Sequence, residues 1–293
     1  MARLRLPRAL RPLAQASGMP RWLLISGAVI VVVFVAMAIL APLVAPYGFD
    51  QVTAGGGRFE QQAAPDGAHP FGTTVQSTDV LSRVIWGSRT AIEVVVLALI
   101  FSLLIGVPLG LFSGYVGGRI DRALVLVMDA LFAFPYLLLA IVIAFLLSDK
   151  FGQGVLTAAL AITVVYIPQY FRVVRNHTIS VREEPYVEAA RALGAPRHTI
   201  IRRYVFNNVI QNVPSIATLN AADAILTLAA LGFLGYGIQP TDAAEWGYDL
   251  NRAIDDAGAG IWWTGLFPGM AIVLLVTGFT LVGEGLNDVL NPL

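Results

Sequence analysis

Long apolar runs separated by shorter polar stretches make up most of this chain. The runs cover about residues 22–44, 90–113, 123–147, 155–177, 207–236 and 264–286. An α-helix needs roughly 20 mostly apolar residues to cross the hydrocarbon core of a bilayer. The pattern therefore predicts six transmembrane helices. The third run contains Asp129 and Pro135, and the fifth is unusually polar, so these two depart most from a simple span.

The first apolar run is too long for the core of a signal peptide, so we interpret 22–44 as a retained helix. The alanines of "APLVAPY" leave a cleaved signal as the alternative. Residues 45–88 then form an extracytoplasmic loop rich in Gly, Gln and Asp. Its end, "DVLSRVIWGSRTAI", is predicted to be amphipathic and to lead into the second span.

The basic residues of the connecting loops predict the orientation. The arm at 1–21 carries five arginines and no acid, and the loop after the fourth span is also rich in arginine. The alternate loops contain few basic residues. Because cytoplasmic loops carry an excess of Lys and Arg, both termini and the polar segment 183–208 are expected to be cytoplasmic.

Composition supports a membrane protein and excludes several kinds of site. Hydrophobic residues make up 57% of the chain and charged residues 13%, against about a quarter in soluble domains. Mean hydropathy is +0.72. The zero net charge argues against a nucleic-acid partner. With no cysteine and three scattered histidines, we expect no disulfide, no metal site and no bound cofactor. The predicted class is an all-α integral membrane protein.

The polar segment contains the signals of one short helix. Pro185 suits a first helical turn, acidic residues surround that end, and Gly194 suits the stop. A helix this short is marginal alone in water, so it must pack on its own membrane domain or on another protein. It offers a small, nearly flat face, formed by Ala189, Ala190 and Ala192. From the residues alone, a loop that merely sets topology explains the segment equally well.

Several motifs, in order along the chain, resemble one family. "EAARALG" resembles the EAA loop of ABC importer permeases. "APLVAPYGFD", "HPFGTTVQSTDVLSRVIWGSRTAI", "LGFLGYGIQPTDAAEWG" and "LVGEGLNDVLNPL" are similar to stretches of the C-type subunit in the dipeptide/oligopeptide/nickel branch. The sequence departs from the family pattern at Thr74, Ser77, Thr78, Asn207 and Leu228, which leaves substrate and gating details open.

The resemblance implies a type I ABC importer permease fold, with a five-helix core at 89–293. It also implies a heterodimer with a similar permease, two cytoplasmic ATPases that use ATP and Mg, an extracytoplasmic binding protein, and a bacterial inner membrane. The chain has no GxxxxGK[ST] phosphate loop, so it should have no ATPase activity of its own. Short peptides are the expected substrates, with nickel, haem or another small ligand as the alternative.

The resemblance assigns the ATPase contact to the loop at 183–208. Its short helix is expected to sit in a groove of the ATPase and to move with it. The residues expected to carry this coupling are Glu184, Tyr186, Glu188, Ala189, Ala190, Leu193, Gly194 and Arg197.

Polar residues of the fifth run predict a translocation pathway. Asn212, Asn220 and Asp223 have spacings compatible with one helical face, and Asp223 could attract the amino terminus of a peptide. Hydrogen bonding between helices is the alternative for this face. Pro135 and Pro214 are expected to kink their helices and to serve as hinges.

Other polar residues have simpler interpretations. Asp129 is expected to pair with Arg119 or Arg122. "GLFSG" around Ser113 is similar to an intramembrane protease motif, but close helix packing explains it better. The acids of 237–263 are expected to form a solvated outer surface: Asp242, Glu245, Asp249, Asp255 and Asp256. A stand-alone secondary transporter is disfavoured, because the spans do not divide into two similar halves.

Overall fold

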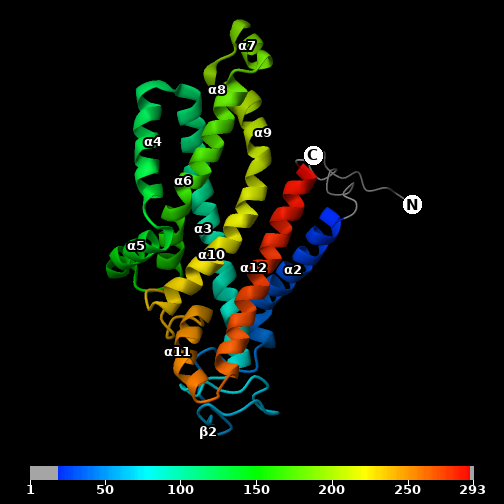
Figure 1. The fold of residues 1–293 in the computed structure, drawn as a ribbon, viewed down its shortest axis with the longest axis vertical. Helices are drawn as coiled ribbons and strands as arrows, with labels where there is room; N and C mark the ends of the chain where they lie inside the picture. Colours follow the sequence, from blue (N-terminus) through cyan, green and yellow to red (C-terminus); the bar gives the residue numbers. More distant parts are fainter. Residues whose placement is uncertain (1–18, 291–293) are drawn as a thin grey trace, which may run out of the picture.

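The computed structural model describes residues 19–290, which fold into an elongated helical bundle (Figure 1). Residues 1–18 of the predicted basic arm lie outside the described residues. The long helices are α2 (Met19–Val44), α3 (Val80–Val116), α4 (Gly118–Ala133), α5 (Tyr136–Phe151), α6 (Val155–Arg182), α10 (Val213–Phe233), α11 (Trp246–Gly258) and α12 (Trp263–Leu290). The shorter elements are β1 (Thr53–Ala54), β2 (Gly57–Arg58), α7 (Pro185–Ala192), α8 (Arg197–Thr199) and α9 (Phe206–Val209).

Five helices in the described part of the chain are long and apolar enough to span a membrane: α2, α3, α6, α10 and α12. The third predicted span, 123–147, is not one straight helix. It is divided between α4 and α5, which meet at an angle of 98°. Proline lacks an N–H and disfavours a helical conformation of the residue before it. Phe134 accordingly has φ −75° and ψ 140°, and the chain turns at Pro135. The pair counts as one broken span or a re-entrant segment.

The second span is longer than the apolar run suggests, because α3 begins already at Val80. Asp79 caps its N-terminus, and the carboxylate accepts a hydrogen bond from the backbone N–H of Ser82 at 2.7 Å. The predicted amphipathic segment is therefore the first part of the same helix.

Glycines allow α3 to lie directly against α6. A β-carbon on Gly110 would meet the carbonyl oxygen of Phe171 at 2.7 Å, and one on Gly114 would meet that of Arg175 at 2.7 Å. Both distances are too short for a real β-carbon. The interpretation of "GLFSG" as a close-packing motif is confirmed.

The fifth predicted span, 207–236, begins irregularly. A π-helical segment (Ile200–Val205), α9 and a 3₁₀ turn (Ile210–Asn212) precede the regular helix α10. Pro214 is the second residue of α10 and directly follows the 3₁₀ turn, where the regular helical hydrogen bonding is interrupted. A kink and hinge at Pro214 remains a prediction.

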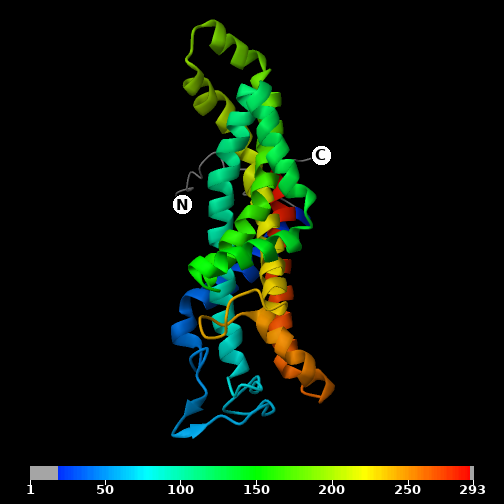
Figure 2. The ribbon, with the colours of Figure 1, turned by 90° about the vertical axis from the view of Figure 1, so that its left-hand side faces the viewer.

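The helices place the polar segments at opposite ends of the molecule (Figures 1 and 2). Helix α7 and its loop extend beyond the bundle at one end. The β1–β2 hairpin and α11 lie at the other end. Helix α2 begins, and α12 ends, toward the α7 end. The described ends of the chain thus lie on the same side as the predicted cytoplasmic loop.

The main hydrophobic core lies where α3, α6, α10 and α12 meet. Its most buried side chains include Ala98, Ile162, Ile225, Leu228 and Leu275. Leu228, one of the departures from the family pattern, is 2% exposed and is a core residue.

Candidate functional site

A cavity of about 560 Å³ lies beside the bend between α4 and α5. Helices α4, α5, α6 and α10 all contribute to it. Its lining is mostly apolar and aromatic: Leu131, Phe132, Ala133, Phe134, Pro135, Tyr136, Leu139, Val165, Tyr166, Gln169, Asp223 and Leu226. Such a volume is typical of sites for small molecules. Because the break at Pro135 directs α5 away from α4, the bend itself creates this space.

Asp223 is the one carboxylate among the residues that line this cavity. Its side chain is exposed to the cavity rather than packed in the core. No Lys, Arg or His forms an ion pair with it among residues 19–290. A carboxylate within an apolar span is costly and normally faces an aqueous path or a partner charge.

Asn220, a second residue of the predicted pathway, does not line the cavity. It is 1% exposed and lies within the core. The side chain of Asn212 lies outside the described residues. Tyr136, Tyr166 and Gln169 line the cavity but were missed in the sequence. Of these three, Gln169 could have been identified from the sequence as a residue of the pathway, since an amide inside an apolar run is unusual.

Asp129 lies near the same region and has a different partner from the one expected. Arg172 of α6 donates to its carboxylate at 2.9 Å, so the predicted pairing with Arg119 or Arg122 is wrong. The guanidinium of Arg172 also lies 4.2 Å from the ring centroid of Phe132, which lines the cavity. The charge of Arg172 is therefore already engaged by a carboxylate and an aromatic ring.

Ser113 forms a structural contact between helices. Its hydroxyl donates to the carboxylate of Asp121 at 2.6 Å, and the side chain is fully buried. Arg175 holds the same carboxylate through two bonds of 2.6 and 2.7 Å. This network joins α3, α4 and α6, and a buried hydroxyl that donates to a carboxylate held by arginine is not an activated nucleophile.

The coupling loop packs on its own chain through one face of α7. Val187 is fully buried and Ala190 is 7% exposed. Val187 belongs to a cluster with Ile200, Val205 and Val209 from the segment that follows. The prediction that Ala190 forms a flat outer face with Ala189 and Ala192 is wrong, because Ala190 is buried. Its part in the coupling remains a prediction.

The opposite face of α7 is exposed. Leu193 is 89% exposed, an unusual position for a leucine at a polar end of the molecule. Six of the predicted coupling residues share this exposure: Glu184, Glu188, Ala189, Leu193, Gly194 and Arg197. The helix ends at Ala192, and Gly194 adopts φ +80°, as expected for a glycine stop.

Tyr186, the remaining predicted coupling residue, has an internal role as well. Its ring is 42% exposed, and its hydroxyl accepts a hydrogen bond from the amide nitrogen of Asn208 at 3.1 Å. Its ring also lies 6.5 Å from that of Tyr204. Tyr186 thus joins α7 to the segment that leads into α10.

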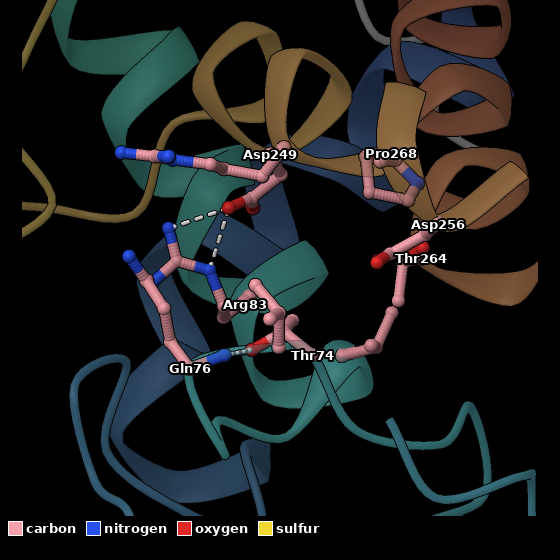
Figure 3. A pocket seen from close by; sticks show the side chains of 11 residues that line it. Thr74, Gln76, Arg83, Asp249, Asp256, Thr264 and Pro268 are labelled. Atoms are coloured by element: carbon pink, nitrogen blue, oxygen red, sulfur yellow. Dashed lines mark hydrogen bonds and ion pairs between the residues drawn. The ribbon is translucent and has the colours of Figure 1, made fainter. Parts of the chain in front are cut away.

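At the other end of the molecule, a buried ion pair joins α3 to α11 (Figure 3). Arg83 donates to Oδ1 of Asp249 through Nε at 2.8 Å and approaches it through Nη2 at 2.7 Å. Nη1 of Arg83 donates to the carbonyl of Phe49 at 3.0 Å. The Arg83 guanidinium thus contacts both the Asp249 carboxylate and the Phe49 carbonyl, and it joins the loop after α2 to α3 and α11.

Glu245 caps the N-terminus of α11 from a buried position. Its two carboxylate oxygens accept hydrogen bonds from the backbone N–H groups of Gly247 and Tyr248, at 2.8 and 2.7 Å. Burial raises the pKa of Glu245 to about 8. Asp249 and Asp256 are also buried, so the prediction that the acids of 237–263 form a solvated surface is wrong for these three.

Residues 74–78, which contain three of the departures from the family pattern, form a turn before α3. The hydroxyl groups of Thr74 and Thr78 are hydrogen-bonded to each other at 2.7 Å. Ser77 has φ +62°, a conformation that favours glycine.

Comparison with known proteins identifies close relatives of this chain. The profile of the family described as "Binding-protein-dependent transport system inner membrane component" matches residues 106–293. The dipeptide transport system permease protein DppC of Alkalihalophilus pseudofirmus is 37% identical, with 92% of this chain and 86% of the relative covered. The probable D,D-dipeptide transport system permease protein DdpC of Escherichia coli K12 is 35% identical, over 92% and 87%. The glutathione transport system permease protein GsiD of Pectobacterium atrosepticum is 31% identical, over 92% and 86%.

Among solved structures, a chain of the MetNI methionine ABC transporter in an inward-facing conformation has the same fold. The TM-score is 0.58, and the match covers 71% of this chain and 96% of that chain. Sequence identity is 18%, so this likeness concerns the fold alone.

Proposed function

Because this chain belongs to the family of binding-protein-dependent transport system inner membrane components, we propose that it forms half of the membrane pathway of an ATP-driven importer for short peptides. Its relatives include permeases named for dipeptides, D,D-dipeptides and glutathione. The type I ABC permease fold and the absence of a phosphate-binding loop agree with a transport subunit that has no ATPase site of its own.

The observation that carries the coupling mechanism is the exposed face of α7, with Leu193 at its end. A second face of the same helix is anchored through Val187. An ATPase that binds the exposed face therefore moves a segment that is packed against the start of α10. Partner ATPases hydrolyse ATP with Mg, and their closure switches the spans between inward- and outward-facing states. The ATPase can drive this switch only through its different affinity for the two states.

The remaining partners follow from the two ends of the molecule. We place the α7 end in the cytoplasm, together with both termini, because the arginine-rich segment that contains α7 lies there. A second, similar permease completes the pathway as a heterodimer in the bacterial plasma membrane. An extracytoplasmic binding protein delivers the peptide to the end that carries α11 and the β1–β2 hairpin. Asp223 and its cavity lie along the pathway, and Pro135 is the proposed hinge.

The test is reconstitution of the chain with its partner permease, two ATPases and the binding protein in liposomes. ATP-dependent uptake of a radiolabelled dipeptide is the expected result. Uptake that proceeds without ATP would indicate a secondary transporter. If nickel or haem stimulates the ATPase activity and dipeptides do not, the proposed substrate is wrong, but the proposal of an ATP-driven importer stands.

A further inference from the structure

The carboxylate of Asp223 lies at mid-depth in its span. It is ten residues from either end of α10, which corresponds to about 15 Å along the helix axis in each direction. A charge at this depth is costly unless a counter-charge or water reaches it. At this depth, a positively charged partner would stabilise the ionised carboxylate of Asp223.

The described part of the chain does not supply this positively charged partner. No basic side chain among residues 19–290 forms an ion pair with Asp223. Arg172, whose guanidinium lies on the cavity-lining ring of Phe132, is itself paired with Asp129 at 2.9 Å. Asp223 therefore faces the cavity without a basic partner among the described residues, and a counter-charge for its ionised form has to come from elsewhere.

The other groups around the cavity restrict what that counter-charge is. The lining offers one carboxylate, one amide (Gln169) and several aromatic rings, and it contains no histidine. A divalent transition metal would require several nitrogen, sulfur or oxygen ligands, which this lining lacks. A protonated amine suits it, because an ammonium binds both to a carboxylate and to the faces of aromatic rings.

We propose that Asp223 binds the protonated terminal amino group of the transported peptide, with Gln169 and the rings of Tyr136 and Tyr166 surrounding the adjacent part of the substrate. This rests on the proposed peptide-import function and specifies which end of the substrate the permease recognises. The site selects peptides with a free amino terminus over the same peptides blocked by acetylation.

The test uses the complete importer in liposomes, with its binding protein, and measures uptake of alanyl-alanine and of N-acetyl-alanyl-alanine. The quantity compared is the ratio of the two uptake rates. Because every variant is assayed with the same binding protein, that protein's own preference cancels between variants. We expect Asp223→Asn to lower the ratio by about tenfold, as loss of a charge-assisted hydrogen bond typically does, and Asp223→Glu to retain most of it.

A matched control is Asp149→Asn, which makes the same exchange at an exposed position near the end of α5 that does not line the cavity. It should leave the ratio unchanged. If Asp223→Asn slows both peptides equally, or prevents assembly, Asp223 has a structural role or pairs with another subunit, and the proposal fails. If the wild-type complex imports neither peptide with ATP, the proposed function fails first and this inference fails with it.

Discussion

The carboxylate of Glu245 occupies the space that a β-carbon on Gly232 would need. Its Oε2 lies almost where the β-carbon would be, so a side chain at this position of α10 would overlap it. The same carboxylate caps α11 through Gly247 and Tyr248. The absence of a side chain at residue 232 and the buried acid at residue 245 therefore depend on each other, and they join the end of the fifth span to α11.

Gly232→Ala is expected to destabilise the protein by about 1–3 kcal/mol or more, because the new methyl group overlaps the Glu245 carboxylate. The melting temperature of the purified complex measures this. Gly258→Ala is the control, since a β-carbon at Gly258 meets nothing within 4 Å. Equal melting temperatures for the two variants would contradict the close contact.

The stability of this region should depend on pH through Glu245, whose pKa is raised from 4.5 to about 8. The folded state binds the proton more tightly than the unfolded chain does. The stability that Glu245 contributes is therefore complete below pH 4.5 and is lost as pH rises toward and through 8. The slope is at most about 1.4 kcal/mol per pH unit.

Glu245→Gln should flatten this dependence. Melting temperatures of wild type and variant between pH 5 and 8.5 provide the measurement, and the two slopes are compared rather than the absolute values, because glutamine also changes the cap. Asp249 and Arg83 lie nearby and are present in both proteins, so their effects cancel. Parallel slopes would show that Glu245 does not titrate in this range.

Arg83→Met is expected to destabilise the protein by about 3–5 kcal/mol, because it leaves Asp249 as a buried, unpaired charge. The double variant Arg83→Met, Asp249→Leu should be less destabilised than Arg83→Met alone, since it removes both charges. Thermal unfolding of all three proteins completes the comparison. A double variant that melts below Arg83→Met would mean that the pair matters for reasons other than charge.

Leu193→Glu should leave the stability of the chain within about 0.5 kcal/mol of wild type, because this side chain is 89% exposed. It should lower ATP-driven uptake at least tenfold, because it places a charge in the proposed contact with the ATPase. Uptake and ATPase activity of the reconstituted complex are measured together. Leu193→Met, which keeps an apolar side chain of similar size, should restore uptake; normal uptake by Leu193→Glu would remove Leu193 from the contact.

The sequence alone was sufficient for the features that depend on neighbours along the chain. Hydropathy located the spans, because crossing a bilayer requires a minimum length of apolar helix. Pro185 and Gly194 predicted the limits of α7 to within two residues, since the missing N–H and the left-handed conformation are local properties. The ordered motifs predicted the family, which the comparisons confirm.

Only the tertiary structure decided which side chains meet. The 98° turn at Pro135, the burial of Glu245 and the inward position of Ala190 each depend on helices distant in sequence. A proline predicts that a helix breaks, but packing against α6 and α10 determines the direction of the next one. The sequence alone predicted a solvated Glu245, but Gly232 of α10 leaves space for its carboxylate in the interior. Because burial and pairing are properties of contacts between segments, the cavity around Asp223 could be recognised only in the folded protein.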